Sequence, residues 1–98
     1  MKTFMLFDVC YRVDQSVDQY AANLTQPILD LVMHETDAKV GRLTICLPDV
    51  VLAPGETILR DCFCELIDDL EDADILKFTG RYARSGFAQY PVVKLVQP

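Results

Sequence analysis

Hydrophobic and polar residues alternate along the first part of the chain. Over residues 3–13, Met5, Phe7, Val9 and the following odd positions are apolar, whereas the even positions mix apolar, charged and thiol side chains. A period of two residues is typical of a β-strand, whose side chains point alternately to the two faces of a sheet. The pattern predicts one strand with an apolar face and a mixed face.

The spacing of apolar residues becomes helical after residue 17. From Val17 to Val32 they recur every three or four positions, which predicts about four turns of an amphipathic helix within residues 17–35. Pro27 interrupts the hydrogen bonding of such a helix but not its apolar phase. The sequence leaves open whether this is one kinked helix or two short helices meeting near Thr25, with Pro27 in the first turn of the second.

Strand-like patterns return on both sides of residue 56. Alternation over residues 39–47 predicts a strand, Pro48-Asp49 a turn, and residues 50–53 a short return strand. Residues 75–96 are typical of two strands joined near Arg84-Ser85-Gly86. Pro91 lacks an amide hydrogen, which places the last strand at an edge or at a bulge.

Residues 57–73 predict a second helix with one apolar side and one acidic side. Leu59, Phe63, Leu66 and Leu70 share a side at helical spacing. Like charges three or four residues apart each cost about 0.2–0.5 kcal/mol, so local helix stability does not account for the acids. The alternatives are a merely solvated face, a surface for a basic partner and a metal site, although a straight helix points its carboxylate oxygens outward rather than toward one ion. The candidate partner-binding carboxylates are Asp61, Glu65, Asp68, Asp69 and Asp72.

The order of elements predicts the fold class. Ninety-eight residues fit one domain, taken as 1–98. Strand, helix, strand, helix and two further strands are most economically arranged as an α+β, ferredoxin-like two-layer sandwich. Two helices would then cover one face of a mostly antiparallel sheet of four or five strands.

The face of that sheet opposite the helices would be exposed and would carry cations. It has two interpretations: stacking and phosphate contacts with single-stranded RNA, or association with another copy of the chain. We favour self-association, because this face carries only one aromatic residue. The candidate residues of the face are Phe4, Leu6, Arg12, Arg42, Lys77 and Arg81.

The net charge of the chain limits the kinds of partner that it can be expected to bind. The chain is 51% hydrophobic and carries a net charge of −6. Residues 14–37 contain five acids and no Lys or Arg, whereas residues 75–98 contain four cations and no acid. The whole chain is repelled by phosphate backbones and anionic membranes, so direct binding to either is not expected.

Few residues point to catalysis or to a cofactor. In the helix predicted for residues 57–73, the sulfurs of Cys62 and Cys64 would point about 200° apart, so they could not share a metal ion. His34 is the only histidine and would end the first helix. Neither a targeting segment nor a membrane span is visible, so we expect a cytoplasmic protein with reduced cysteines and without metal or cofactor.

The segment FMLFDV, residues 4–9, resembles the opening strand of the small CRISPR adaptation nuclease subunits and their antitoxin relatives. In those families the strand ends in a metal-binding aspartate on a ferredoxin-like dimer. The resemblance implies that Asp8 residues paired across a dimer would bind Mg²⁺ and cleave a phosphodiester. The structural alternative is an ion pair of Asp8 with Arg12 or Arg42.

Taken together, the sequence predicts a binding protein rather than an enzyme. We expect a small homo-oligomeric regulator or inhibitor whose acidic helix engages a basic surface on another protein. Its size and acidity suit a phage or mobile-element product directed at a host nucleic-acid-handling machine. The alternatives are a metal-dependent nuclease that uses Asp8 and an RNA-binding protein that uses the sheet face.

Overall fold

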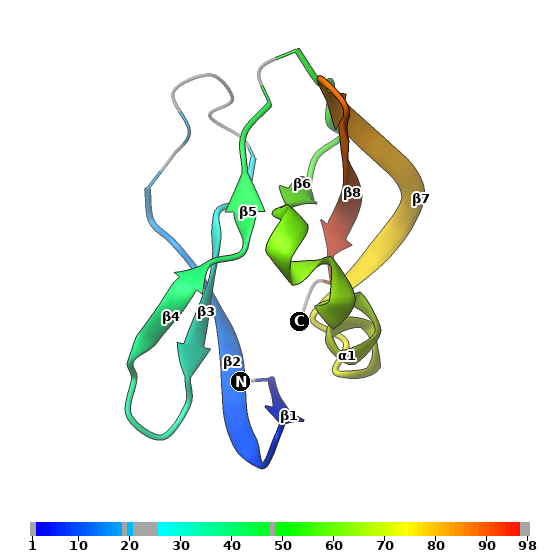
Figure 1. Ribbon diagram of the computed structural model, residues 1–98. Helices are drawn as coiled ribbons and strands as arrows, with labels where there is room; N and C mark the ends of the chain where they lie inside the picture. The colour runs from blue at the N-terminus through cyan, green and yellow to red at the C-terminus, as the bar shows by residue number, and fades with distance from the viewer. Residues whose placement is uncertain (1, 19, 21–25, 48, 97–98) are drawn as a thin grey trace.

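Two antiparallel sheets of four strands make up most of the fold (Figure 1). The computed structural model describes residues 2–18, 20, 26–47 and 49–96, with backbone alone at 61, 62 and 64. The first sheet has the order β1-β2-β3-β4 and the second β5-β6-β8-β7. Their bounds are β1 Thr3–Leu6, β2 Val9–Gln15, β3 Leu29–Met33, β4 Lys39–Arg42, β5 Thr44–Ile45, β6 Glu56–Leu59, β7 Leu76–Ser85 and β8 Ala88–Leu95.

Leu43 joins the two sheets. It lies between β4, at the edge of the first sheet, and β5, at the edge of the second. Its N–H donates to the carbonyl of Leu29 at 2.8 Å, and its carbonyl accepts from the N–H of Arg60 at 2.7 Å. One continuous segment therefore serves both sheets, and the Leu43 side chain between them is fully buried.

Apolar residues form two clusters. The larger one, between the sheets and the helical segment, contains Phe4, Leu29, Leu31, Leu43, Leu59, Leu70, Ile75, Leu76 and Val93. The smaller one contains Ile58, Ala83 and Val92, and the partly buried Leu47, Val50 and Leu52 from the segment between β5 and β6 pack against it. Both sides of β6 are therefore covered, which explains why all four of its residues are buried.

The ferredoxin-like prediction is wrong, because the two long helices are absent from the described residues. Residues 29–33, expected to end the first helix, form the strand β3, four of whose five residues are buried. A strand buried on both faces reads as a near-continuous apolar run, which short stretches of sequence do not distinguish from a helix. Residues 19 and 21–25 lie outside the described part, and the kink-or-split question at Pro27 does not apply to residues 29–33.

The second expected helix begins later and is shorter than predicted. Residues 56–59 form β6, a 3-10 helix follows at Asp61–Leu66, and the α-helix α1 spans only Ile67–Asp72. The end of α1 is well defined: the N–H groups of Asp74 and Ile75 donate to the carbonyls of Glu71 and Leu70, both at 3.0 Å. Asp74 takes φ +57°, so this end has the Schellman pattern with aspartate at the position that usually holds glycine.

The first expected strand is a hairpin of two strands. Phe7 and Asp8 form the turn with φ +49° and +66°, the positive values that a type I′ turn requires. Phe4 pairs with Tyr11 and Leu6 with Val9, so the core-facing positions change from even to odd across the turn. The single odd-numbered apolar face is therefore wrong, since Phe7 is 98% exposed whereas Phe4 is buried.

The C-terminal hairpin was predicted correctly. Strands β7 and β8 pair antiparallel, and the turn falls at Gly86-Phe87, next to the expected triplet. Strand β8 lies between β6 and β7, so Pro91 is not on an edge strand; it pairs with Tyr82, where the register of β7 shifts. At this irregularity the Thr79 hydroxyl donates to the Val92 carbonyl at 2.8 Å.

The expected return strand at 50–53 is absent from the described structure.

A cluster of buried hydrogen bonds holds residues 26–29 against the joint, by which we mean the segment around Leu43 that connects the two sheets. The Gln26 Nε2 donates to the carbonyl of Ile45 at 2.7 Å and to Thr57 Oγ1 at 2.9 Å. The Thr57 hydroxyl in turn donates to the carbonyl of Pro27 at 2.8 Å. Nearby, the N–H of Leu29 donates to Thr44 Oγ1 at 3.3 Å. These bonds give hydrogen-bond partners to the backbone carbonyls of Pro27 and Ile45 and to the N–H of Leu29. No helix of the described part is long and apolar enough to cross a membrane.

Replacing Thr57 with valine should destabilise the protein by about 1–3 kcal/mol. The substitution keeps the shape of the side chain but leaves the Pro27 carbonyl without its buried donor and the Gln26 amide with one acceptor, the Ile45 carbonyl, in place of two. Urea denaturation would measure the loss. The exposed strand residue Thr3, changed to valine, is the matched control and should alter the free energy of unfolding by less than about 0.5 kcal/mol. Equal effects at both positions would contradict the role of the cluster.

Candidate interaction surfaces

The helical segment carries a concentration of acids on its outer side. We call residues 65–74 the acidic segment; its carboxylates are Glu65, Asp68, Asp69, Glu71, Asp72 and Asp74. Leu70 is fully buried in the larger cluster, and Phe63, Leu66 and Ile67 pack against it. Because one side of the segment is held in the core, Glu65, Asp68, Asp72 and Asp74 are exposed on the other.

The change from 3-10 to α geometry divides the predicted acidic stripe. Side chains four residues apart are about 40° apart around an α-helix but about 120° apart around a 3-10 helix. Asp68 and Asp72 therefore share a side of α1, whereas the predicted continuation of the stripe before residue 65 falls in the 3-10 helix. The Asp61 side chain lies outside the described atoms. Asp69 is half-buried, so the surface is centred on Glu65, Asp68 and Asp72.

Four acids elsewhere in the described structure, Asp14, Asp30, Asp37 and Glu56, are held by cations. Arg12 Nε lies 3.0 Å from Asp14 Oδ1, and its Nη1 lies 2.6 Å from Asp37 Oδ1. Asp30 forms two ion pairs: its Oδ2 lies 3.3 Å from Lys39 Nζ, and its Oδ1 lies 3.3 Å from Arg42 Nε. The hydrogen bonds that Arg12 donates to Asp14 and Asp37 raise the pKa of its guanidinium. By contrast, none of Glu65, Asp68 and Asp72 has an ion pair with any described cation.

The expected exposed sheet face does not exist as one surface. Phe4 is buried in the core, and Leu6 packs against it. Arg12 and Arg42 belong to the first sheet, whereas Lys77 and Arg81 belong to β7 of the second. The physical reason is the turn at Phe7-Asp8, which reverses the chain and turns Phe4 and Leu6 inward.

Arg81 is tied to the body of the second sheet. Its Nη2 donates to Glu56 Oε1, which also accepts from the N–H of Ala53 at 2.8 Å. Glu56 is buried, and the hydrogen bonds from Arg81 and Ala53 lower the pKa of its carboxyl. This pair fastens the segment before β6 to the hairpin formed by β7 and β8.

The tip of the β7–β8 hairpin combines an exposed aromatic ring with a cation. Gly86 takes φ +62°, as the first central residue of a type II′ turn does, and the Phe87 side chain is fully exposed. A hollow of about 420 Å³ is lined there by Arg84, Gly86, Phe87, Ala88 and Gln89. With the Gln89 amide turned so that its oxygen faces the guanidinium, Nε and Nη2 of Arg84 each donate to it at 3.0 Å.

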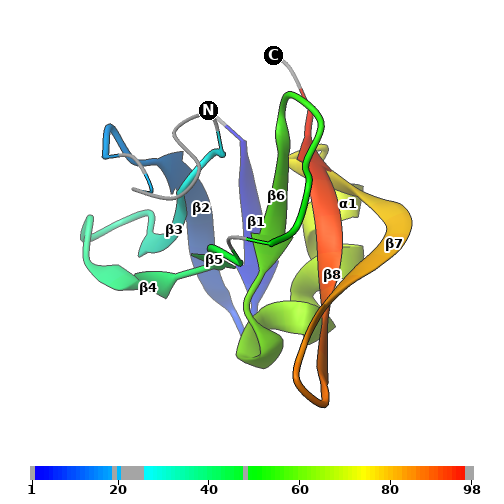
Figure 2. The same ribbon diagram turned by 90° about the horizontal axis from the view of Figure 1, so that it is seen from above.

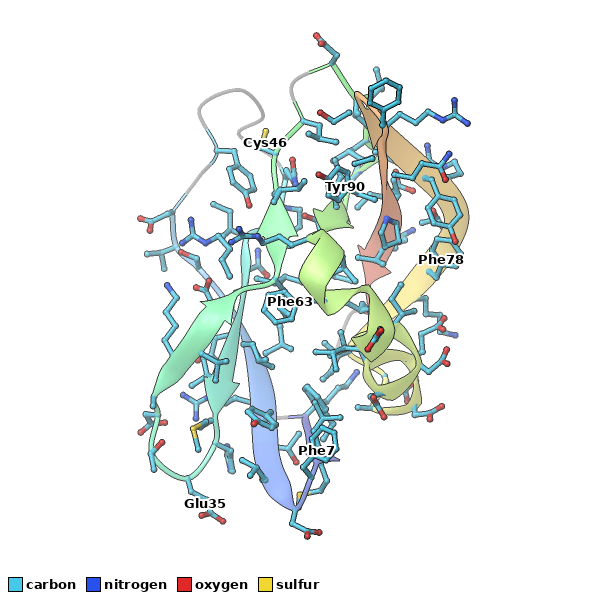
Figure 3. The ribbon with its side chains drawn as sticks, in the orientation of Figure 1. Phe7, Glu35, Cys46, Phe63, Phe78 and Tyr90 are labelled. Carbon is cyan, nitrogen blue, oxygen red and sulfur yellow. The ribbon has the colours of Figure 1, made fainter. Side chains whose placement is uncertain are left out.

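A smaller hollow lies at the opposite end of the molecule, between the β1–β2 and β3–β4 turns. Its volume is about 140 Å³, and it is lined by Asp8, Val9, Cys10, Met33, Glu35 and Thr36. Figure 3 shows Phe7 and Glu35 at this lower end, far from Tyr90 of the second sheet. Asp8 forms none of the expected ion pairs, because Arg12 and Arg42 bind other carboxylates.

The hollow does not fit the metal site that the resemblance implied. Asp8 occupies an exposed hairpin turn rather than the end of a ferredoxin-like strand. Among the described residues, no group of three or more His, Cys, Asp or Glu side chains is placed to hold a metal ion. Cys10 and Cys46 are free thiols.

Comparisons with known proteins are negative. No family model, no curated protein and no solved structure matches the chain.

Sequence reasoning missed both turn-centred surfaces. Phe7 was read as part of an apolar strand face, and Phe87 was not singled out. A signal for the second was present, because Ser85-Gly86 between two β-patterned runs places the next residue at a hairpin tip, where a phenylalanine is solvent-exposed. For Phe7 no comparable signal exists, because the turn contains neither glycine nor asparagine.

Glu56→Gln should reduce the acid sensitivity of the fold. The folded state lowers the pKa of Glu56, so its contribution is fully present above the ordinary value of about 4.5 and is lost as pH falls through the lower folded value. The variant should be less stable than the wild type at pH 7, and the difference should shrink below about pH 4.5. Urea denaturation from pH 7 to pH 3 would show this. Glu35→Gln, at an exposed glutamate without an ion pair in the described structure, should leave the pH profile unchanged.

Proposed function

We propose that this chain is a small protein-binding regulator or inhibitor that engages a basic surface on another protein through its acidic segment. The observation that carries the proposal is the contrast between two groups of acids. Asp14, Asp30, Asp37 and Glu56 are held by cations, whereas Glu65, Asp68 and Asp72 are exposed without a described ion pair. Asp8, Asp18, Glu35 and Asp49 are also exposed and unpaired in the described structure, but they do not lie within one helical segment as these three do.

The arrangement of the segment supports binding rather than chemistry. The carboxylates stand on a rigid element, because Leu70 is fully buried and the Schellman pattern closes the end of α1. A backbone fixed in this way does not have to be ordered when a partner binds. Convex acidic surfaces of this kind complement clusters of lysine and arginine and accelerate association at low ionic strength.

The local energetics are consistent with selection for something other than helix stability. Asp68 and Asp72 repel each other one helical turn apart, and Asp72 lies in the last turn, next to the negative end of α1. A lysine at residue 72 would remove both effects. A basic partner would reverse the sign of these interactions, since its cations would lie close to both carboxylates.

The RNA-binding alternative has less support. Arg12, Arg42 and Arg81 are each bound to carboxylates, which reduces the net positive charge that they offer a phosphate backbone. Phe4, the aromatic residue on which a base would have stacked, is buried. The nuclease alternative lacks both the implied fold and a described cluster of metal ligands.

Reversing Asp68 and Asp72 to lysine should weaken partner binding at least tenfold, which corresponds to about 1.4 kcal/mol. The partner would be isolated from the native host with the immobilised chain at low salt, and its Kd would then be measured with purified components across a range of NaCl concentrations. Electrostatic recognition predicts that the wild-type affinity falls as salt rises. Both lysines replace exposed residues, so the thermal unfolding transition should remain cooperative.

The matched control reverses Asp18 and Asp49, which are also exposed and lie outside the acidic segment. This variant has the same net charge as the first and should change the Kd by less than about twofold, a few tenths of a kcal/mol. Equal weakening by both variants would show that only net charge matters. Unchanged binding of the Asp68 and Asp72 variant would refute the proposal.

A further inference from the structure

The two hollows have complementary chemistry and lie at opposite ends of the molecule. Figure 1 shows the β7–β8 turn at the top and the β1–β2 and β3–β4 turns at the bottom, and Figure 2 gives the view along this direction. The molecule is elongated, with principal extents of 37 × 25 × 24 Å. A contact between unlike ends of two copies therefore needs no change in the fold of either.

We propose that copies of this chain associate head to tail, the tip of the β7–β8 hairpin of one copy docking in the hollow between the β1–β2 and β3–β4 turns of the next. This contact is independent of the acidic segment and of the partner that the segment binds. The occupant of the hollow is the Phe87 ring, accompanied by the Arg84 guanidinium.

The tip of the β7–β8 hairpin carries residue types that commonly insert into a pocket of a binding partner. Phe87 is fully exposed, and large aromatic residues together with arginine dominate the binding energy of protein interfaces. The side-chain partner of Arg84 is the Gln89 amide, and no described acid forms an ion pair with it. Residues 75–98 contain no acid at all, so the hairpin that carries the tip is uniformly basic.

The hollow offers what this tip requires. Its volume of about 140 Å³ is close to that of the apolar cavities of about 150 Å³ that bind benzene. Val9, Cys10 and Met33 supply apolar lining, and a methionine thioether makes favourable contacts with aromatic rings. Asp8 and Glu35 stand at the same hollow, both exposed and without an ion pair to any described cation. The acids can therefore receive the Arg84 guanidinium while the ring occupies the apolar part.

The geometry predicts the kind of assembly. The contact is heterologous, since it joins two different patches, and each added copy leaves one tip and one hollow unused. Assembly should therefore continue beyond a dimer unless the rotation between copies closes a ring. A symmetric dimer, by contrast, would stop at two.

Sedimentation velocity over a range of protein concentrations tests this proposal. The wild type should form species larger than a dimer as concentration rises, less so at high salt, whereas Phe87→Ala and Arg84→Glu should each shift assembly to at least tenfold higher concentration. Both substituted residues are exposed, so circular dichroism should show an unchanged fold. Val51→Ala, at another exposed apolar residue, is the control and should assemble as the wild type does.

Charge exchange identifies the receiving site. A variant with Asp8→Asn and Glu35→Lys should assemble poorly alone, as should Arg84→Glu, but a mixture of the two should assemble because each offers the other complementary ends. Asparagine is chosen at residue 8 because it tolerates the positive φ found there. Reversal of Asp68 and Asp72 should leave assembly unchanged, which separates this contact from the acidic segment.

Three results would overturn the proposal. The first is a wild type that stays monomeric at all concentrations, or a dimer that Phe87→Ala leaves intact. The second is loss of assembly on reversal of Asp68 and Asp72, which would place the tip on the acidic segment instead. The third is binding of a fluorescent single-stranded oligonucleotide that Phe87→Ala abolishes in a wild type that does not assemble.

Discussion

The fold depends on the hydrogen bonds that Leu43 makes to both sheets. Its N–H is bound to Leu29 in the first sheet, and its carbonyl is bound by Arg60 beside the second. A residue with this double role cannot be displaced without breaking one sheet edge or the other. Its side chain is also fully buried in the cluster that fills the space between the sheets. The buried hydrogen bonds of Gln26, Thr44 and Thr57 surround the same joint, so polar contacts and apolar packing meet there, although Gln26 Oε1 has no hydrogen-bond partner in the described structure. The hairpins project from this joint, and their turns form the two ends of the molecule.

The charged residues of the first sheet form ion pairs with one another, whereas those of the acidic segment do not. Around the first sheet, Arg12, Arg42 and Lys39 cover buried or half-buried strand positions, and the carboxylates of Asp14, Asp30 and Asp37 hold them in place. These ions stabilise the fold by satisfying one another, and they are therefore poor candidates for external contacts. The acidic segment differs, since Asp68 and Asp72 repel each other and form no ion pair with a described cation. A net charge of −6 alone would not distinguish these two groups, and only their placement does so.

Some elements were readable from the sequence and others were not, for identifiable reasons. The β7–β8 hairpin was predictable because alternation on both sides of Gly86 and the position of Pro91 are local signals. β3 was not, because it is buried on both faces and its apolar residues fit a helical period as well as a strand. The predicted start of the second helix is wrong because Thr57, Ile58 and Leu59 belong to a strand that pairs with β8 and contacts the joint. These contacts are distant in sequence, so no local pattern contains them. The acidic segment itself was found, but the 3-10 helix of residues 61–66 before α1 was not, because it depends on packing rather than on a local pattern.

The backbone of the turn at Phe7-Asp8 is locally unfavourable. Phe7 and Asp8 both take positive φ, a region that non-glycine residues occupy at a cost of about 1 kcal/mol or more each. Asparagine and glycine would form the same turn without that cost, so local stability does not explain a fully exposed phenylalanine at this position. The turn nevertheless does two things that the fold can use: it directs Phe4 and Leu6 into the core, and it holds Asp8 at the rim of the hollow beside Glu35. The second of these contributes nothing to the isolated chain. A strained turn that presents a carboxylate and an aromatic ring to solvent is therefore better explained by a contact with another molecule than by the stability of this one.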